Sequence, residues 1–408
     1  MGYPSGMTRH ALISGASVGG PALAHELNAR GWRTTVVERY PRLRDEGQNI
    51  DVRGAGREVL RRMGLEAEAL VTSTTEVGTR FVDDRGGTVG EFPAGEDDIH
   101  GPTAELEILR GEMARILFEH TVDDTDYRFG EQIADLTDAD DHVTATLASG
   151  ERIDADLVVV AEGTRSRTRS LVVPDAELSE LGLIIANITI PRTADDDRWW
   201  RWMHTTRTRG VSLRPDNVGT TRAMLSFLTD VRGLEQLDHD DQVMILRKTF
   251  ADVGWEAPRI LEVLDDAPMY VDAVAQVKLD RWSSGRRVLL GDAAWATGPF
   301  GTGTTLALTG AHVLAGELDR NADHQVALQR YEEVMRPFVT EAQNVNPRMI
   351  RAVNPGSRAA LVAQQGVLRT VATLQRWTGL ADRIFSPPAD KVELPEYALR
   401  AREQKVGL

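Results

Sequence analysis

Apolar positions near the N-terminus follow the order strand, glycine turn, helix, strand and acidic residue. The apolar run from Ala11 leads into Gly15-Ala16-Ser17-Val18-Gly19-Gly20, and a second apolar run ends at Glu38 and Arg39. Glycines let the backbone approach a pyrophosphate, a helix N-terminus offers unpaired N–H groups, and Glu38 can accept hydrogen bonds from ribose hydroxyls. Ser17 replaces the second glycine of the usual Gly-x-Gly-x-x-Gly pattern and leaves less room there. The segment predicts a dinucleotide site, the alternative being a turn that only starts a helix.

Later apolar runs extend the pattern. Residues 157–160 and 288–290 are apolar throughout, which is typical of parallel strands covered on both faces. Alternation and helical periodicity predict further strands in 127–160, 181–191, 198–229 and 269–277, a hairpin in 81–89, and helices in 109–120, 240–251 and 257–265. After residue 291 the pattern is helical, with breaks expected at Pro337, Pro347, Pro355 and Pro387.

Composition narrows the possible chemistry. The chain has 408 residues, a net charge of −15 and no cysteine. An acidic protein is not attracted to nucleic acid or anionic membranes, and without cysteine there is no disulfide, thiolate metal site or catalytic thiol. The nine histidines lack metal-ligand spacing, so we expect no metal. Without a signal peptide or a run of about 18 apolar residues, the chain is expected to be cytoplasmic, with two or more domains.

Acidic and glycine residues follow both buried strands. The first is followed by Glu162-Gly163, and the second by Gly291-Asp292 and the turn Pro299-Phe300-Gly301-Thr302-Gly303. An acid at a strand end next to a glycine-containing helix start can hold a ligand hydroxyl and a phosphate together. The glycines of the last turn have a simpler interpretation as a tight turn without a ligand.

In order and spacing, these three motifs resemble those of the FAD-dependent monooxygenases of the para-hydroxybenzoate hydroxylase class, in particular the compact tetracycline-inactivating and salicylate-hydroxylase-like members. The resemblance covers residues 9–345. It implies an α/β fold in which a Rossmann-like FAD-binding domain of the glutathione-reductase type is interleaved with a β-sheet substrate domain and followed by C-terminal helices. The implied FAD-binding domain comprises residues 1–75, 100–172 and 276–345, the substrate domain 76–99 and 173–275, and the C-terminal helical segment 346–408.

The resemblance also implies roles for individual residues. Asp292 matches the aspartate that binds the FAD ribitol chain, and Arg110 matches an arginine that contacts FAD. Asp51 stands where compact members place a polar flavin contact, although an ordinary surface carboxylate is an equal alternative. Two residues depart from the family pattern, because Glu162 replaces the aspartate of the usual Asp-Gly and Trp295 replaces a histidine or tyrosine. The implied cofactor contacts are Gly15, Ser17, Val18, Gly19, Gly20, Glu38, Arg39, Asp51, Arg110, Glu162, Gly163, Asp292, Pro299, Gly301, Thr302 and Gly303.

The implied activity is a single-component flavin monooxygenase. NADPH or NADH, binding transiently, would reduce FAD, and a C4a-hydroperoxyflavin formed with O2 would insert one oxygen atom into a hydrophobic aromatic or polyketide-like molecule. The alternatives are a reductase or dehydrogenase of the same fold and a non-catalytic small-molecule-binding relative. A monomer or a homodimer is expected.

The substrate side is marked by tryptophans. Strand alternation places Trp200 and Trp202 on one face and Trp199 on the other. The first face can line a site for a flat polycyclic substrate, although packing between a sheet and a helix is the simpler interpretation. His204 or Arg214 is a candidate to orient a phenol or enol oxygen, and no catalytic base is identified.

Overall fold

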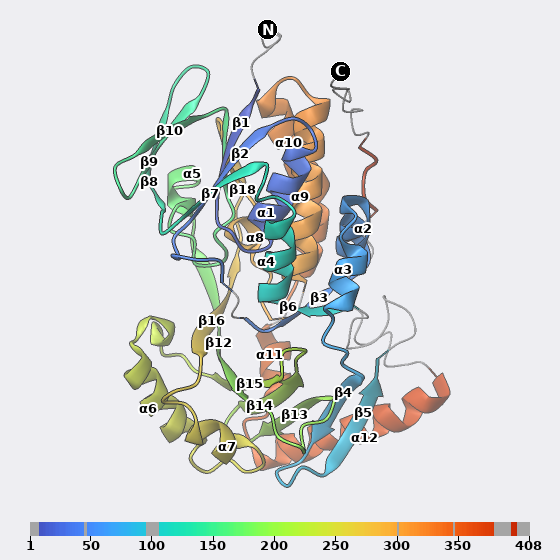
Figure 1. The fold of residues 1–408 in the computed structure, drawn as a ribbon. Coiled ribbons are helices and arrows are strands. Elements are labelled where there is room, and N and C mark those ends of the chain that lie inside the picture. The colour runs from blue at the N-terminus through green and yellow to red at the C-terminus, as the bar shows by residue number, and fades with distance from the viewer. Residues whose placement is uncertain are drawn as a thin grey trace.

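Two large sheets organise the chain, one in the upper and one in the lower part of Figure 1. The computed structural model describes residues 8–44, 47–94, 106–299, 302–345, 347–378 and 393–397. Long antiparallel strands, β12 (Leu178–Pro191) and β16 (Met269–Val277), connect the two parts. The predicted α/β fold is confirmed.

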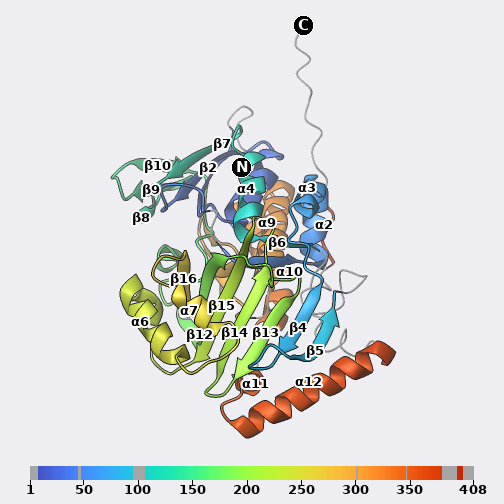
Figure 2. The same ribbon diagram turned by 60° about the horizontal axis from the view of Figure 1, so that its bottom comes forward.

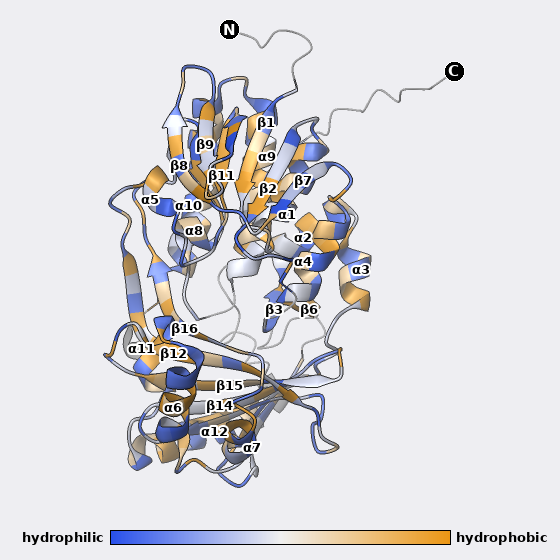
Figure 3. Cartoon of the chain, turned by 60° about the vertical axis from the view of Figure 1, so that its left-hand side comes forward, coloured by the Kyte–Doolittle hydropathy of each residue, from blue (hydrophilic) through white to orange (hydrophobic). Residues whose placement is uncertain are grey.

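The upper sheet has six strands in the order β17-β18-β11-β1-β2-β7. Its central strands are the predicted apolar runs, and Figure 3 shows apolar residues along β11. The strands are β1 (His10–Ser14), β2 (Arg33–Glu38), β7 (Thr125–Phe129), β11 (Leu157–Val160), β17 (Ser283–Ser284) and β18 (Arg287–Leu289). All neighbours are parallel except β17 and β18. Coverage of both faces explains the near-continuous apolar runs.

Helices cover the upper sheet. The first, α1 (Gly19–Asn28), contacts β2 and the long α9 (Gly303–Arg320), and α9 contacts α10 (His324–Ala342). The others are α2 (Gly54–Met63), α3 (Glu66–Val71), α4 (Arg110–Glu119), α5 (Arg169–Val172) and α8 (Asp292–Trp295). A three-stranded sheet of β8 (Ile133–Asp138), β9 (Val143–Leu147) and β10 (Arg152–Ala155) and a two-stranded sheet of β3 (Asn49–Val52) and β6 (Leu106–Leu109) complete this part.

The lower sheet has seven strands in the order β16-β12-β15-β14-β13-β4-β5, side by side in Figure 2. Besides β12 and β16 it contains β4 (Gly78–Val82), β5 (Thr88–Pro93), β13 (Trp200–Thr205), β14 (Arg209–Pro215) and β15 (Thr220–Leu228). One face forms a core with α6 (His239–Phe250) and α7 (Ala257–Glu262), which follow the short helix η1 (Leu234–Gln236). Met203, Val211 and Leu225 belong to this core. The other face therefore presents the alternate residues.

The C-terminal part differs from the prediction at Pro337. We expected a break there, but α10 continues through this residue to Ala342. Tyr331, Met335 and Val339 are buried at intervals of four residues, so one face of the helix packs against the core on both sides of the proline. This burial outweighs the cost of a proline inside a helix, which is about 3 kcal/mol.

The last helices adjoin the lower sheet. Helix α11 (Pro347–Val353) is followed by α12 (Arg358–Thr378), which runs along the strand ends in Figure 2 and contacts β5 and β13. Pro355 lies between them, as expected, whereas Pro387 lies outside the described residues. Within the part of the chain that the structure describes, no helix has both the length and the apolar character needed to span a membrane.

Candidate functional site

The three sequence motifs follow three neighbouring strands of the upper sheet. Gly15 comes directly after β1, Glu162 follows β11 and Asp292 follows β18. These strands are adjacent and parallel, with Ser14 opposite Val160 in the register. The chain proceeds from β1 to β2 on one side and from β11 to β18 on the other. The motifs therefore meet at the carboxyl edge, at the topological switch point where α/β sheets bind ligands.

Backbone geometry explains the glycines of the first motif. Gly15 has a φ of +112°, and its N–H donates to the carbonyl of Val37 at 2.8 Å. A Cβ on Gly15 would overlap the carbonyl oxygen of Ala161, and one on Gly20 would overlap that of Gly15. Ser17, by contrast, is exposed. The turn thus requires glycine at its two ends and accommodates a side chain at position 17.

Glu38 is oriented by the same turn. Its carboxylate accepts hydrogen bonds from the backbone N–H groups of Ala16 at 2.9 Å and Tyr40 at 3.0 Å. The residue is half-buried, so surface remains for a further donor. Arg39 is exposed, with its guanidinium 5.0 Å from the centre of the Tyr40 ring.

The carboxylate of Glu162 is engaged by its own loop. It accepts from the hydroxyls of Ser14 at 2.5 Å, Thr168 at 2.6 Å and Ser166 at 2.8 Å. It thus connects the end of β1 to the loop after β11. Gly163 has a φ of +82°, and no heavy atom lies within 4 Å of the Cβ that another residue would add. The open side of this loop is therefore at Gly163 and not at the carboxylate.

Asp292 begins helix α8 beside the N-terminus of α9. Burial raises the pKa of Asp292, against the lowering effects of Arg110, Arg169 and a hydrogen bond from Thr164. The residue nevertheless keeps accessible surface. A Cβ on Gly303, the first residue of α9, would lie 3.2 Å from Oδ1 of Asp292.

The rest of the third motif surrounds this carboxylate. Thr302 is buried and its hydroxyl is 3.0 Å from that of Thr297, whereas Pro299 is half-exposed. Gly301 lies outside the described residues.

Two helix N-termini at this edge lack side-chain caps. The N-cap residues, Val18 of α1 and Thr302 of α9, make no capping hydrogen bond through their side chains. The N–H groups of the first turn and the helix dipole therefore favour a bound anion. Arg110 begins α4 at the same edge, where its N–H donates to the carbonyl of Gln48. Donors for phosphate and carboxylates for sugar hydroxyls are thus combined, a set that fits a dinucleotide.

An aromatic row lines the lower sheet on the face opposite α6 and α7. The rings of Trp200 and Trp202 are 5.1 Å apart, so the predicted alternation is confirmed. His204 stacks on Trp202 at 5.7 Å and on Phe81 at 6.0 Å. At the β5 end, a Cβ on Gly90 would lie 3.2 Å from the carbonyl of Leu368 in α12. Gly90 pairs with Phe81, so α12 packs against the face that carries the row, at its β5 edge.

Arg214 is surrounded by carboxylates. Its guanidinium contacts Glu107 at 2.7 Å, Glu76 at 2.8 Å and Asp51 at 3.0 Å, and lies 4.0 Å from the Trp200 ring centre. The Glu76 and Glu107 side chains are 0% and 2% exposed. Burial, reinforced by Glu107, raises the pKa of Glu76 well above its usual range despite Arg214. Arg214 and Asp51, predicted to act separately, thus share one buried network.

Sequence reasoning missed three acidic residues: Glu76 and Glu107, which contact Arg214, and Asp272 in β16. Glu107 and Asp272 interrupt apolar strands, in Leu106-Glu107-Ile108-Leu109 and in the segment 269–277. A charged residue at such a position is the signal that would have identified them. Glu76 lies in a connection and carries no comparable signal.

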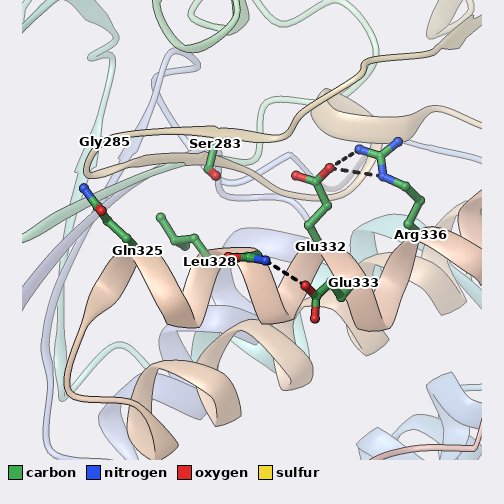
Figure 4. Close-up of a pocket in the computed structure, with 8 residues that line it drawn as sticks. Ser283, Gly285, Gln325, Leu328, Glu332, Glu333 and Arg336 are labelled. Carbon is green, nitrogen blue, oxygen red and sulfur yellow. Dashed lines mark hydrogen bonds and ion pairs between the residues drawn. The ribbon is translucent and has the colours of Figure 1, made fainter.

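A separate pocket of about 450 Å³ lies between β17 and α10 (Figure 4). Ser283, Leu328, Glu332 and Arg336 line it, and Glu332 pairs with Arg336. None of the residues predicted to contact a cofactor or substrate lines this pocket.

His204 is expected to remain neutral through the physiological range. Burial lowers its pKa from 6.5 to about 4. An unfolded chain takes up this proton at higher pH than the folded protein, so His204 lowers the stability as the pH falls from 6.5 towards 4. In NMR titrations its ring signals should stay at the neutral position down to about pH 5, whereas the exposed His142, whose pKa Asp141 raises, should shift. A His204 signal that titrates between pH 6 and 7 would contradict this environment.

The chain is similar to known proteins over most of its length. The family described as "FAD binding domain" matches residues 8–345. A flavin-dependent monooxygenase of Phoma sp. is 33% identical over 422 aligned residues, covering 95% of this chain and 97% of that protein. The crystal structure of tetracycline destructase Tet(55) matches with a TM-score of 0.79 and 31% identity over 96% of this chain and 99% of that one. Klebsiella pneumoniae HpxO complexed with FAD and uric acid shares the fold, with a TM-score of 0.75, 20% identity and coverage of 95% and 99%.

Proposed function

The chain belongs to the family of FAD-dependent monooxygenases, and from this premise we propose that FAD lies along the carboxyl edge of the upper sheet and serves a flat hydrophobic substrate at the aromatic row. The meeting of the three motifs at the ends of adjacent parallel strands carries the proposal. At its Trp200 end the aromatic row contacts Arg214, which pairs with Asp51 of β3.

Each motif holds a different part of the cofactor. Glu38 accepts hydrogen bonds from ribose hydroxyls, and the N–H groups at the start of α1 bind the pyrophosphate together with Arg110. Asp292 accepts from the ribityl chain, beside the positive N-terminus of α9. When bound, FAD supplies electron transfer from NAD(P)H and the activation of O2. Gly163, Pro299, Thr302 and Gly303 provide close backbone contacts around it.

The aromatic row binds the substrate and keeps water away. Trp202 and His204 offer an aromatic surface, and the neutral imidazole provides one donor nitrogen and one acceptor nitrogen without a charge. This surface matches aromatic or polyketide-like rings, and tetracycline is a suitable first probe given the name of Tet(55). Arg214 does not contact the substrate itself. Its guanidinium packs on the Trp200 ring and positions that ring in the row.

NADPH or NADH binds transiently at the surface, and the enzyme works as a monomer or homodimer. The upper sheet with its helices forms the FAD-binding unit, and residues 76–99 and 173–275 form the substrate unit. Helices α11 and α12 belong to neither.

The Trp202→Ala variant tests the substrate surface. Losing a stacked aromatic contact of about 1.5 kcal/mol or more should lower kcat/KM at least about tenfold. The measurement is substrate-dependent NAD(P)H oxidation with O2 uptake, on tetracycline and a panel of phenolic and polyketide compounds. Trp199→Ala is the matched control, because Trp199 stacks with Arg80 instead of the aromatic row. Equal losses in both variants, or no oxygenated product from any compound, would refute the proposed surface.

A further inference from the structure

Strand β16 borders the motif loops of the proposed FAD site. Near its start, Tyr270 hydrogen-bonds Gln48 and its ring centre lies 5.7 Å from the Arg110 guanidinium. In its middle, the carbonyl of Ala273 accepts a hydrogen bond of 3.0 Å from Arg165, in the loop after β11. Groups that β16 projects between these contacts therefore lie beside the cofactor.

Asp272 is such a group. Alternation places Asp272 on the same face as Tyr270 and Gln276, while Val271 and Ala273 pack into the core on the opposite face. Gln276, two periods of the alternation further on, donates to the carbonyl of Thr297 in the third motif at 2.9 Å. Asp272 thus lies between contacts to Arg110, to the second motif and to the third motif.

The carboxylate of Asp272 differs from those of its acidic neighbours in having no polar partner among the described residues. Among the described residues it has no hydrogen-bond or ion-pair partner, and it is half-buried. Asp292 is hydrogen-bonded to Thr164, and Glu235 pairs with Arg165 at 3.3 Å.

The charge environment of Asp272 is mixed. Burial raises its pKa to about 6; Asp292 and Glu235 add to this rise, whereas Arg165 and Arg110 oppose it. The titratable groups that face it are Arg165 after β11, Glu235 in η1, Arg110 of α4, Asp292 of α8 and Tyr270 of its own strand. Added negative charge nearby raises such a pKa further.

We propose that Asp272 takes up one proton from solvent when the flavin bound at this site is reduced. NAD(P)H delivers a hydride, which carries two electrons and one proton, and leaves as NAD(P)⁺. The site then holds one additional negative charge. The proton that moves from water to the Asp272 carboxylate cancels this charge, so the net charge of the site is the same before and after reduction. The inference rests on the proposed function, since it requires FAD at this edge.

The reduction potential of the bound flavin between pH 7 and 8 tests this role. For a two-electron reduction, each proton taken up makes the reduction equilibrium tenfold less favourable per pH unit. The reduction potential therefore falls by about 30 mV per pH unit for each proton. The wild-type holoenzyme should take up two protons and show a slope of about 60 mV per pH unit, and Asp272→Asn should show about 30 mV. Asp266→Asn, an exposed carboxylate between α7 and β16, should keep the wild-type slope.

The possible outcomes separate the two proposals. If the wild-type protein binds no FAD, the proposed function fails before any potential is measured. If FAD binds and the slopes of wild type and Asp272→Asn are equal, at either value, the role of Asp272 is refuted while FAD binding stands. Should Asp272→Asn not retain FAD, the wild type is compared with Asp272→Glu during photoreduction with a pH indicator. Both should take up two protons per two electrons, and a single proton in the wild type overturns the inference.

Discussion

Replacing Arg214 by methionine is expected to lower the free energy of unfolding by about 3–5 kcal/mol. The guanidinium contacts three carboxylates, two of them almost fully buried, at 2.7 to 3.0 Å. Removing the counterion leaves these charges unpaired in an environment that solvates them poorly. Thermal and denaturant unfolding of the variant measure the loss.

Two further variants test whether the loss of stability comes from the unpaired carboxylates. Arg207→Met removes a guanidinium that is 74% exposed and 3.7 Å from Asp252, so it should change stability by less than about 1 kcal/mol. Adding Glu76→Gln to Arg214→Met removes one of the unpaired carboxylates and should restore part of the loss. If Arg214→Met is as stable as Arg207→Met, the network does not hold the junction between the lower sheet and the β3–β6 sheet.

Asp292→Ala is expected to weaken FAD binding about 10–150-fold. This range corresponds to the loss of one hydrogen bond to a charged group, about 1.5–3 kcal/mol. The carboxylate lies against the start of α9 and is hydrogen-bonded to Thr164, which fixes its position at the proposed ribityl contact. Titration of the apoprotein with FAD, followed by flavin fluorescence, gives the dissociation constant.

Matched variants distinguish a lost contact from general damage. Asp292→Asn keeps an acceptor of the same shape and should lie between the wild type and Asp292→Ala. Asp266→Ala removes an exposed carboxylate and should bind FAD normally. Full flavin occupancy in Asp292→Ala at wild-type affinity would show that this residue does not hold the cofactor.

Much of the fold follows from local patterns in the sequence. The segment 269–277 was predicted as a strand and forms β16 with the same ends, and the run 157–160 is the central strand β11. These elements could be predicted because burial on one or both faces of a strand determines which neighbouring positions are apolar. Pro337 shows the limit of such reasoning, because packing of α10 over its whole length overrides a local signal.

The site was only partly predictable, for a related reason. The three motifs carry their own glycines and acids, and parallel pairing of β1, β11 and β18 brings them to one edge. The network around Arg214 joins Asp51, Glu76 and Glu107, which are distant in sequence. The network forms only because the lower sheet and the β3–β6 sheet lie close together, and no local sequence pattern predicts this arrangement.

A crystal structure of the protein with bound FAD tests the central claim most directly. The account predicts the adenosine ribose at Glu38, the pyrophosphate at the start of α1 beside Arg110, the ribityl chain at Asp292, and the flavin ring towards Trp202. FAD bound elsewhere on the chain, or lying along this edge without contact to Glu38 and Asp292, would contradict it.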